Sequence, residues 1–563
     1  MMRRLVFLAA LAVSTSASAI ESFAPGSEND PRMRATDFLA GTHRYFSAAS
    51  ELLQLKNEIP ARNEPLEFLS RLADYALSFG MEERAEVIYR ELEAANADPM
   101  SLARAQVRLG EFLYQRGYED RAVSNLRAVR NKIPDAVLPE WQDTMSHALL
   151  AQGRYGEAAE VLSDFESPTR SGGPYALYNL GVALINDGRA GQGVNLLDRV
   201  GNISAENEEQ LSLRDKANLA LAYHYLRLQQ GGTAIPLFSR VRNSGPLSNR
   251  ALLGLGWAFL APRGTLQKKV EVGDEVPSEP NAFKSFSAIG GILPPGFRET
   301  DIYKRAGLRP LRLDKVSADQ EAALKRALVP WVELVGRDPI DPAVQEGLLA
   351  IPYTLDRLGA HAEARQYYER GIAALEAGRK DIGRTAEYVR SGRMIATIVR
   401  RTADAESGWT WELKDLPGTQ ETYYLQALIS ENRFQEQVKN FRDVELMRNN
   451  LEAWSTHIEE LQAAFIKRER QHAAGVVADT RNGGQPAVAP AAEDTWEELV
   501  ALKACILTLR PQLRIASDAQ RKLLENLARD ELAKQRRRTE KYLVEARFAL
   551  ARIYDRELKG GAP

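Results

Sequence analysis

The stretch Gln106–Pro134 reads QVRLGEFLYQRGYEDRAVSNLRAVRNKIP and contains two amphipathic helical patterns separated by a turn. Small residues stand at Gly110 in the first pattern and at Ala122 in the second, and Gly117 lies between the two patterns. Two antiparallel helices approach closely only where side chains are small, while larger apolar residues fill the flanks. The stretch therefore predicts a helix-turn-helix unit.

The same unit recurs along the chain. Each unit leaves an apolar face that the next unit buries, so stacked units form a superhelical array with a concave surface. The sequence therefore predicts an all-α fold, an α-solenoid. The small residue of the first helix recurs with spacings of 37, 36, 35, 39 and 36 residues, at Ala73, Gly110, Ser146, Gly181, Ala220 and Gly256.

These units resemble the tetratricopeptide repeat (TPR) family, whose helix-turn-helix unit has about 34 residues. The match is best over Ala103–Ala136, where Leu126 and Val129 supply core positions and Pro134 closes the second helix. It extends over about Leu66–Ala377. The resemblance implies a TPR-like solenoid that binds segments of other proteins, and it identifies no particular partner.

The sixth unit is interrupted after its first helix. The stretch ALLGLGWAFLAP, Ala251–Pro262, fits a first helix, but the residues directly after it have neither a helical pattern nor enough apolar side chains to pack. The distance from Gly256 to the next first-helix crossing, Pro352, is 96 residues, 62 more than the family period of about 34. Proline at that crossing is expected to kink its helix. The offsets of the second helix reappear only downstream, at Ala327, Trp331, Leu334 and Pro339.

The sequence thus predicts a long irregular insertion, residues 263–318, between two helices of one unit. Loops of this length are usually functional or disordered. The insertion is rich in Pro and Gly but carries many apolar residues, so two interpretations remain open. It either folds back onto the solenoid, inside its groove, or forms a disordered surface loop.

The resemblance also implies which first-helix positions face the concave groove. They lie one residue after the crossing, three residues before it, and one helical turn beyond it. A groove dense in aromatic residues suits an anchored peptide or helix; the alternative is that these side chains pack against the insertion or a neighbouring helix. The candidate groove residues are Tyr114, Tyr178, Val182, Ile185, Leu221, His224, Leu253, Trp257, Leu260 and Tyr353.

The C-terminal third contains two long helical patterns with alternating spacings of 3 and 4 residues, typical of a coiled-coil seam. The flexible composition of the segment between them predicts a linker and an antiparallel, coiled-coil-like helical hairpin. Pro511 is expected to kink or break the second arm. The final pattern, near Ala546, looks like one more solenoid helix that returns the C-terminus to the repeats. The two seams comprise Met447, Leu451, Trp454, Ile458, Leu461 and Phe465, and then Leu499, Leu502, Ile506, Leu509, Leu513 and Ala516.

The N-terminus MMRRLVFLAALAVSTSASA has the basic start, apolar run and small residues of a secretory signal peptide cleaved after Ala19. The apolar run is too short to span a bilayer, and no cysteine stands directly after the cleavage site, so a lipoprotein is not expected. The expected location is the periplasm. Cys505, the only cysteine, is expected to be a buried small hydrophobe, and no intrachain disulfide can form.

Composition and motifs argue against several classes of function. A formal net charge of -2 gives no reason to expect a nucleic-acid partner. The six histidines have no metal-ligand spacing, and no catalytic, phosphate-binding or dinucleotide motif occurs, so no catalytic, cofactor or metal site is expected. The expected function is a non-enzymatic exported scaffold that binds envelope proteins through its groove and hairpin. Two alternatives stay open: a glycan- or peptidoglycan-binding accessory protein of polysaccharide export or cell-wall assembly, and a homo-oligomer joined by the hairpin arms.

The expected organisation of the chain combines these patterns. It comprises a signal peptide (1–19), an N-terminal segment with one helix (20–65), repeats (66–262), the insertion (263–318), further repeats (319–377), a connecting region (378–420), a long helix (421–470), a flexible linker (471–494), C-terminal helices (495–558) and a disordered tail (559–563).

Overall fold

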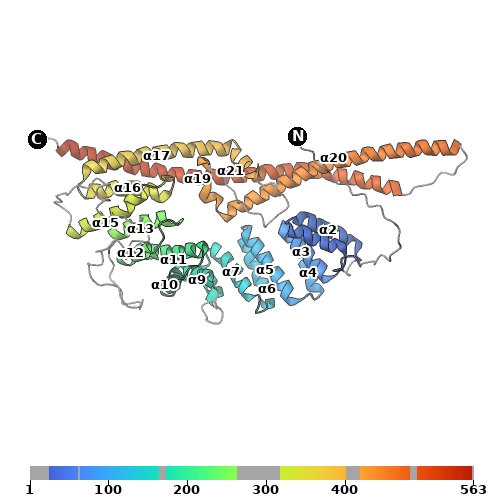
Figure 1. Ribbon diagram of the computed structural model, residues 1–563, viewed down its shortest axis with the longest axis horizontal. Coiled ribbons are helices and arrows are strands. Elements are labelled where there is room, and N and C mark those ends of the chain that lie inside the picture. The colour runs from blue at the N-terminus through green and yellow to red at the C-terminus, as the bar shows by residue number, and fades with distance from the viewer. Residues whose placement is uncertain are drawn as a thin grey trace. The chain divides into compact units, whose positions relative to one another are not determined.

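A computed structural model describes residues 24–60, 64–163, 173–262, 317–400, 419–481 and 491–560 of the chain (Figure 1). Every regular element in these ranges is a helix, which confirms the all-α prediction. The predicted signal peptide and nearly all of the predicted insertion lie outside the described residues. The described residues fall into two compact units, one within Met1–Ala105 and the other within Gln106–Pro563.

The first unit contains two helices before the first predicted repeat, so the prediction of a single helix in 20–65 is wrong. Asp30 begins the first of them, because its carboxylate accepts a hydrogen bond from the backbone of Arg32 at 2.9 Å. The helical pattern is interrupted at His43, whose φ of 60° is left-handed. The helices of this unit are α1 (Pro31–Gly41), α2 (Tyr45–Glu58), α3 (Leu66–Phe79) and α4 (Glu82–Ala94).

The repeats continue as helix pairs joined by tight turns. Gly117 and Gly188 make two of these turns with φ values of 78° and 88°, a conformation that glycine adopts without strain. The next pairs along the chain are α5 (Pro99–Gln115) with α6 (Glu119–Val129), α7 (Leu138–Ala151) with α8 (Tyr155–Leu162), α9 (Gly173–Asn186) with α10 (Ala190–Gly201), and α11 (Glu208–Arg227) with α12 (Gly231–Ser239).

Small residues stand where the two helices of a pair cross, as the repeat pattern predicts. A β-carbon added at Gly110 would lie 2.6 Å from Cδ2 of Leu126 on the partner helix. One added at Gly181 would lie 2.9 Å from Cδ2 of Leu197 and 3.1 Å from the carbonyl oxygen of Gly193. These distances are shorter than a normal carbon contact of about 3.5–4.0 Å. Glycine is therefore required for the close approach of the two helices.

The sixth pair joins α13 (Ser248–Leu260) to α15 (Ala318–Leu334), which is the pairing that the repeat pattern predicts across the insertion. Trp331 of α15 is fully buried, and its indole nitrogen donates to the carbonyl oxygen of Leu253 at 3.1 Å. Arg337, just beyond α15, donates to the side chains of Ser248 and Asn249 at 2.7 Å each. Both the last turn of α15 and the turn after the helix are therefore fixed to α13.

The seventh pair consists of α16 (Pro342–Arg357) and α17 (His361–Arg390), and α18 (Arg393–Arg400) comes after it. Pro352 is buried inside α16, which continues through it for five more residues. The second helix of the pair extends well past Ala377, where the repeat region was expected to end. Part of the predicted connecting region is therefore helical.

The C-terminal third forms the predicted antiparallel helical hairpin, from α20 (Asn432–Arg481) and α21 (Ala491–Gly560). Glu452 pairs with Arg510 at 2.7 Å, and Glu459 pairs with Lys503 at 3.6 Å. Residue numbers rise on one helix as they fall on the other, so the helices are antiparallel. One buried cluster, Leu451, Ile458, Leu499 and Ile506, lies between them.

Three boundaries in this region were predicted wrongly. A short helix, α19 (Gln420–Ile429), is separate from α20, although a single helix was expected over 421–470. Both long helices extend into the predicted linker, of which only residues 482–490 lie outside the described residues. One helix continues through Pro511, which is exposed, so that water can bond the carbonyl that the proline leaves unpaired.

The final part of α21 returns to the repeats and packs along α17 (Figure 1). Ala546 and Ile553 are buried in the core that contains residues of α16 and α17. The Tyr554 hydroxyl donates to Glu369 at 2.8 Å, and Arg556 pairs with Asp356 at 2.9 Å. The return of the C-terminus was predicted, but it is the continuation of a hairpin arm and not a separate helix.

Candidate functional site

The first helices of the repeat pairs in the second unit carry a row of half-buried side chains, which we call the first-helix face. It is defined by eight of the ten predicted groove residues together with His147. Most are partly buried, and Tyr353 is 44% exposed. The eight predicted members are Tyr114, Tyr178, Val182, Ile185, His224, Trp257, Leu260 and Tyr353.

Leu221 and Leu253 do not line this face, and their prediction as groove residues is wrong. Their exposed fractions are 1% and 8%, and both belong to the buried core. The same core contains two large second-helix aromatic side chains, Phe238 and Trp331. A β-carbon at Gly254 would lie 2.3 Å from the ring of Phe238, which shows how closely that ring approaches the first helix of the sixth pair. Packing in one core with such large side chains leaves Leu221 and Leu253 buried.

A polar row connects three successive first helices. The rings of Tyr114 on α5 and His147 on α7 are stacked, with centroids 5.9 Å apart and an interplanar angle of 24°. The amide nitrogen of Asn179 on α9 lies 3.1 Å from Nε2 of His147. His147 thus contacts a side chain on the first helix before it and one on the first helix after it.

Sequence reasoning missed His147 and Asn179, although a signal for the histidine was present. His147 comes one position after the crossing residue Ser146, the same offset that places Trp257 after Gly256. This offset points to the first-helix face. Asn179 has no comparable offset, and only the structure brings it to His147.

Burial shifts the pKa of several groups on or beside this face. Burial raises the pKa of Glu111, whose carboxylate accepts a hydrogen bond from the Gln115 amide at 3.0 Å. Burial also raises the pKa of the Tyr114 and Tyr178 phenols. It lowers the pKa of His224, and the nearby positive charge of Arg227 adds to that effect. The neutral forms of these groups are therefore favoured.

The middle of the face is aromatic and aliphatic. Tyr178 packs against the core, and the ammonium group of Lys216 lies 5.2 Å from the centre of its ring. Val182 and Ile185 are also partly buried against the same core. A cation over an aromatic ring is favourable by about 0.5–1 kcal/mol at exposed sites. The Tyr178 ring is thus held by the core and by the ammonium group of Lys216.

Trp257 is held by side chains of two other helices, α15 and α16. Its ring meets Trp331 edge-on, with centroids 4.9 Å apart, and its indole nitrogen donates to Oε1 of Glu346 at 2.8 Å. The hydroxyl of Tyr542, on α21, reaches Oε2 of the same carboxylate at 3.4 Å. Burial and this carboxylate raise the pKa of Tyr542 to about 12. The indole nitrogen of Trp257 therefore bonds within the chain, and the C-terminal helix contacts the same carboxylate.

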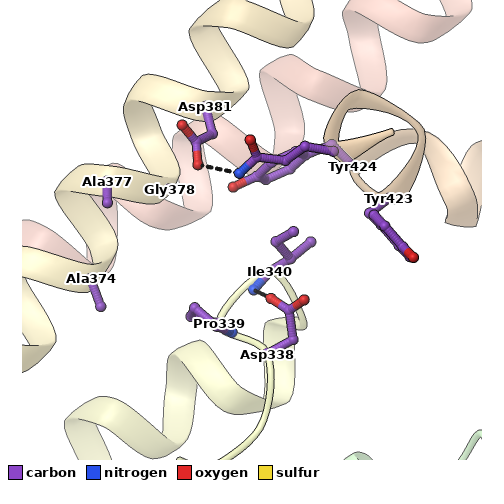
Figure 2. Close-up of a pocket in the computed structure, with 10 residues that line it drawn as sticks. Asp338, Pro339, Ile340, Ala374, Ala377, Gly378, Asp381, Tyr423 and Tyr424 are labelled. Atoms are coloured by element: carbon purple, nitrogen blue, oxygen red, sulfur yellow. Dashed lines mark hydrogen bonds between the residues drawn. The ribbon is translucent and has the colours of Figure 1, made fainter. Parts of the chain in front are cut away.

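A separate cavity of about 360 Å³ lies between the turn after α15, the middle of α17, and α19 (Figure 2). Carboxylates of Asp338 and Asp381 line it, and the Gln420 amide donates to the latter at 2.8 Å. Tyr423 is 55% exposed beside it, whereas Tyr424 is 3% exposed. Burial, reinforced by both carboxylates, raises the pKa of Tyr424 to about 12.

No sequence signal marks this cavity, because its lining comes from three separate segments that share no spacing. It offers two carboxylates, an amide and two aromatic rings, a set that suits polar ligands with hydroxyl or cationic groups.

The described residues offer no centre for metal chemistry: none of their His, Cys, Asp and Glu side chains gather in groups of three or more that could hold an ion. Among the described helices, none has the length and apolar composition needed to cross a bilayer.

No known family profile matches the sequence, and no curated protein matches it. A solved structure of a monomeric IFIT1 mutant with m7Gppp-AAAA is similar over 75% of this chain and 83% of that chain, with 12% identity and a TM-score of 0.24. Values this low carry no argument about function, so the fold assignment rests on the helix pairs described above.

Proposed function

We propose that the chain is an exported, non-enzymatic scaffold that holds segments of envelope proteins on its first-helix face. The observation that carries the proposal is the row formed by Tyr114, His147 and Asn179, in which His147 contacts a side chain of the preceding and of the following first helix. Immobilising flexible side chains costs about 0.5–1.5 kcal/mol each on binding. A row that is already fixed avoids part of that cost.

The chemistry of the face favours an apolar or amphipathic segment. Its central members are aromatic or aliphatic, and burial favours the neutral forms of Glu111 and His224 beside them. Apolar anchors that enter a half-buried surface contribute most of the affinity in such complexes. Export itself rests on the signal-like residues 1–19 and is part of the proposal.

Affinity purification of the full chain under native conditions tests this proposal. We expect a double variant, His147→Ala with Tyr178→Ala, to lose partners that the unmodified chain retains, as measured by quantitative mass spectrometry. Leu228→Ala is the matched control, because Leu228 is 54% exposed at the end of α11 and is not a member of the face. Equal recovery of every partner by the double variant would contradict the proposal.

A second candidate function, glycan binding, is favoured by the cavity. Tyr423, which is 55% exposed, lines the same cavity as the carboxylates of Asp338 and Asp381, a set of groups suited to a sugar ring and its hydroxyl groups. Calorimetry of the full chain with soluble peptidoglycan fragments tests it. Binding that Tyr423→Ala abolishes and His147→Ala leaves unchanged supports the candidate, whereas no heat of binding, or binding insensitive to Tyr423→Ala, rejects it.

A further inference from the structure

The two long edges of the α20–α21 hairpin differ in chemistry. One edge is closed by ion pairs between the helices, Arg510 with Glu452 at 2.7 Å and Lys503 with Glu459 at 3.6 Å. The buried seam runs along the middle of each helix. With 3.6 residues per turn, the ion pairs lie on one side of this seam, and a second row of apolar residues lies on its other side. These interhelical ion pairs therefore lie along only one of the two edges.

The other edge is apolar and exposed. Met447, Trp454 and Leu461 succeed one another on α20 at seven-residue spacing, with exposed fractions of 37%, 52% and 42%. Leu502 and Leu509 lie opposite them on α21, with exposed fractions of 53% and 39%. We call these five residues the hairpin edge.

Half of each predicted seam therefore lies outside the hairpin core. The buried cluster between the helices contains Leu451, Ile458, Leu499 and Ile506, the alternate members of the same 3–4 spacing. In a regular two-stranded coiled coil, one facing helix covers both rows of such a seam. In the hairpin, each helix has a partner for one row only.

Most neighbours of the hairpin edge between its two ends carry no formal charge; Glu460, which lies 3.7 Å from His457, is an exception. Helical spacing places small or neutral side chains next to it, even though 27% of the chain's residues are charged. A surface with little charge offers little to a strongly charged peptide, an anionic lipid headgroup or a nucleic acid. The neighbouring residues are Asn450, Ala453, His457 and Ala464 on α20, and Ala501, Cys505, Thr508 and Gln512 on α21.

We propose that the hairpin edge is the interface with a second copy of this chain, so that two hairpins form a four-helix bundle. In a twofold interface both partners use the same patch, so the patch must fit its own copy. A second hairpin meets this requirement, because it supplies the same 3–4 spacing and little charge to repel. The 15 residues from Met447 to Leu461 form about 22 Å of helix, and two helices are about 20 Å wide, so the footprint is on the order of 450 Å² per chain. Stable interfaces bury about 800 Å² per partner, and smaller ones are typical of weaker complexes, which agrees with a Kd in the micromolar range.

Light scattering of the full chain during size-exclusion chromatography tests the proposal. We expect about twice the mass of one chain at about 100 µM, a concentration at which a complex with a micromolar Kd is largely formed. The double variant Leu461→Glu with Leu502→Glu should elute as a monomer. Ile515→Glu is the matched control, because Ile515 is 67% exposed on α21 but lies away from the edge; this variant should remain a dimer. Far-UV circular dichroism checks that all three proteins are equally helical.

The native Cys505 provides a second measurement. It is exposed in the single chain and lies between Leu502 and Leu509 along the hairpin edge. Its rate of alkylation should fall several-fold as the protein concentration rises, and the double glutamate variant should abolish that dependence. A monomeric wild type, or a dimer that survives both glutamates, overturns the proposal. Neither outcome bears on the first-helix face, because its residues are unchanged in these variants.

Discussion

Replacing Gly256 with alanine tests the interrupted sixth pair through its closest contact. The new β-carbon would lie 2.2 Å from two atoms of the Trp331 ring, whereas carbon atoms pack at about 3.5–4.0 Å. The ring is fully buried and hydrogen-bonded to Leu253, so it cannot move without losing that bond. Overpacking of this kind costs about 1–3 kcal/mol, and the shortness of the contact indicates the upper part of that range.

Helix propensity acts in the opposite direction. Alanine is favoured over glycine by about 1 kcal/mol inside a helix, so Gly256→Ala should destabilise the pair by about 1–2 kcal/mol overall. Gly383→Ala is the matched control, because no atom lies within 4 Å of the β-carbon it would add in α17. That variant should stabilise its helix by up to about 1 kcal/mol.

Removing the ring should reverse the sign of the effect. Trp331→Ala alone should cost about 3–5 kcal/mol. In that background, Gly256→Ala has space and should stabilise by about 1 kcal/mol, so the coupling energy of the double-mutant cycle is about 2–3 kcal/mol. Hydrogen exchange measured by mass spectrometry on peptides from α13 and α15 reports the local free energy of opening. The reasoning is refuted if Gly256→Ala stabilises the pair as Gly383→Ala stabilises α17.

Three further predictions concern other parts of the chain. Arg242→Met should destabilise the repeats by about 3 kcal/mol in urea unfolding, because it removes the 2.6 Å ion pair of Asp215, a fully buried carboxylate; a loss below about 0.5 kcal/mol would contradict this. Burial raises the pKa of Glu111, so the folded state binds its proton more tightly and this carboxylate destabilises the fold above its ordinary pKa of about 4.5. Glu111→Gln should therefore raise the thermal midpoint at pH 7, with a gain that shrinks as the pH falls through the raised pKa toward 4.5; a gain independent of pH would refute the assignment. Asp30→Ala should expose α1 to faster hydrogen exchange at a cost of about 1–2 kcal/mol, because this residue caps the helix, and unchanged exchange would show that the cap is dispensable.

The repeat architecture was predictable from sequence because its determinants are local. A small residue at a crossing and a glycine at a turn recur at a fixed period, and the steric reason for each is contained in a single unit. The same offsets identified Trp331 as the partner of the first helix that contains Gly256, although the insertion separates them. A β-carbon added at Gly256 would lie only 2.2 Å from the ring of Trp331, which shows how closely these two helices approach each other.

Several features of the site depend on contacts that no period encodes. Leu221 and Leu253 satisfy the groove offsets, but the large partners Phe238 and Trp331 share their core and bury them. The exposure of Cys505, which was expected to be buried, is a similar case, because helical spacing places it beside the row of the seam that lacks a partner. The sequence reveals an apolar row, but only the packed structure shows whether another helix covers it.

Site-specific photo-crosslinking in living cells tests the central functional claim most directly. A photoreactive amino acid at position 178 or 353 lies on the first-helix face, whereas one at position 195, an exposed residue of the second helix α10, does not. We predict that both positions on the face capture the same partner protein and that position 195 does not. Equal capture from position 195, or crosslinks only within the chain itself, would contradict the assignment of this face as the binding surface.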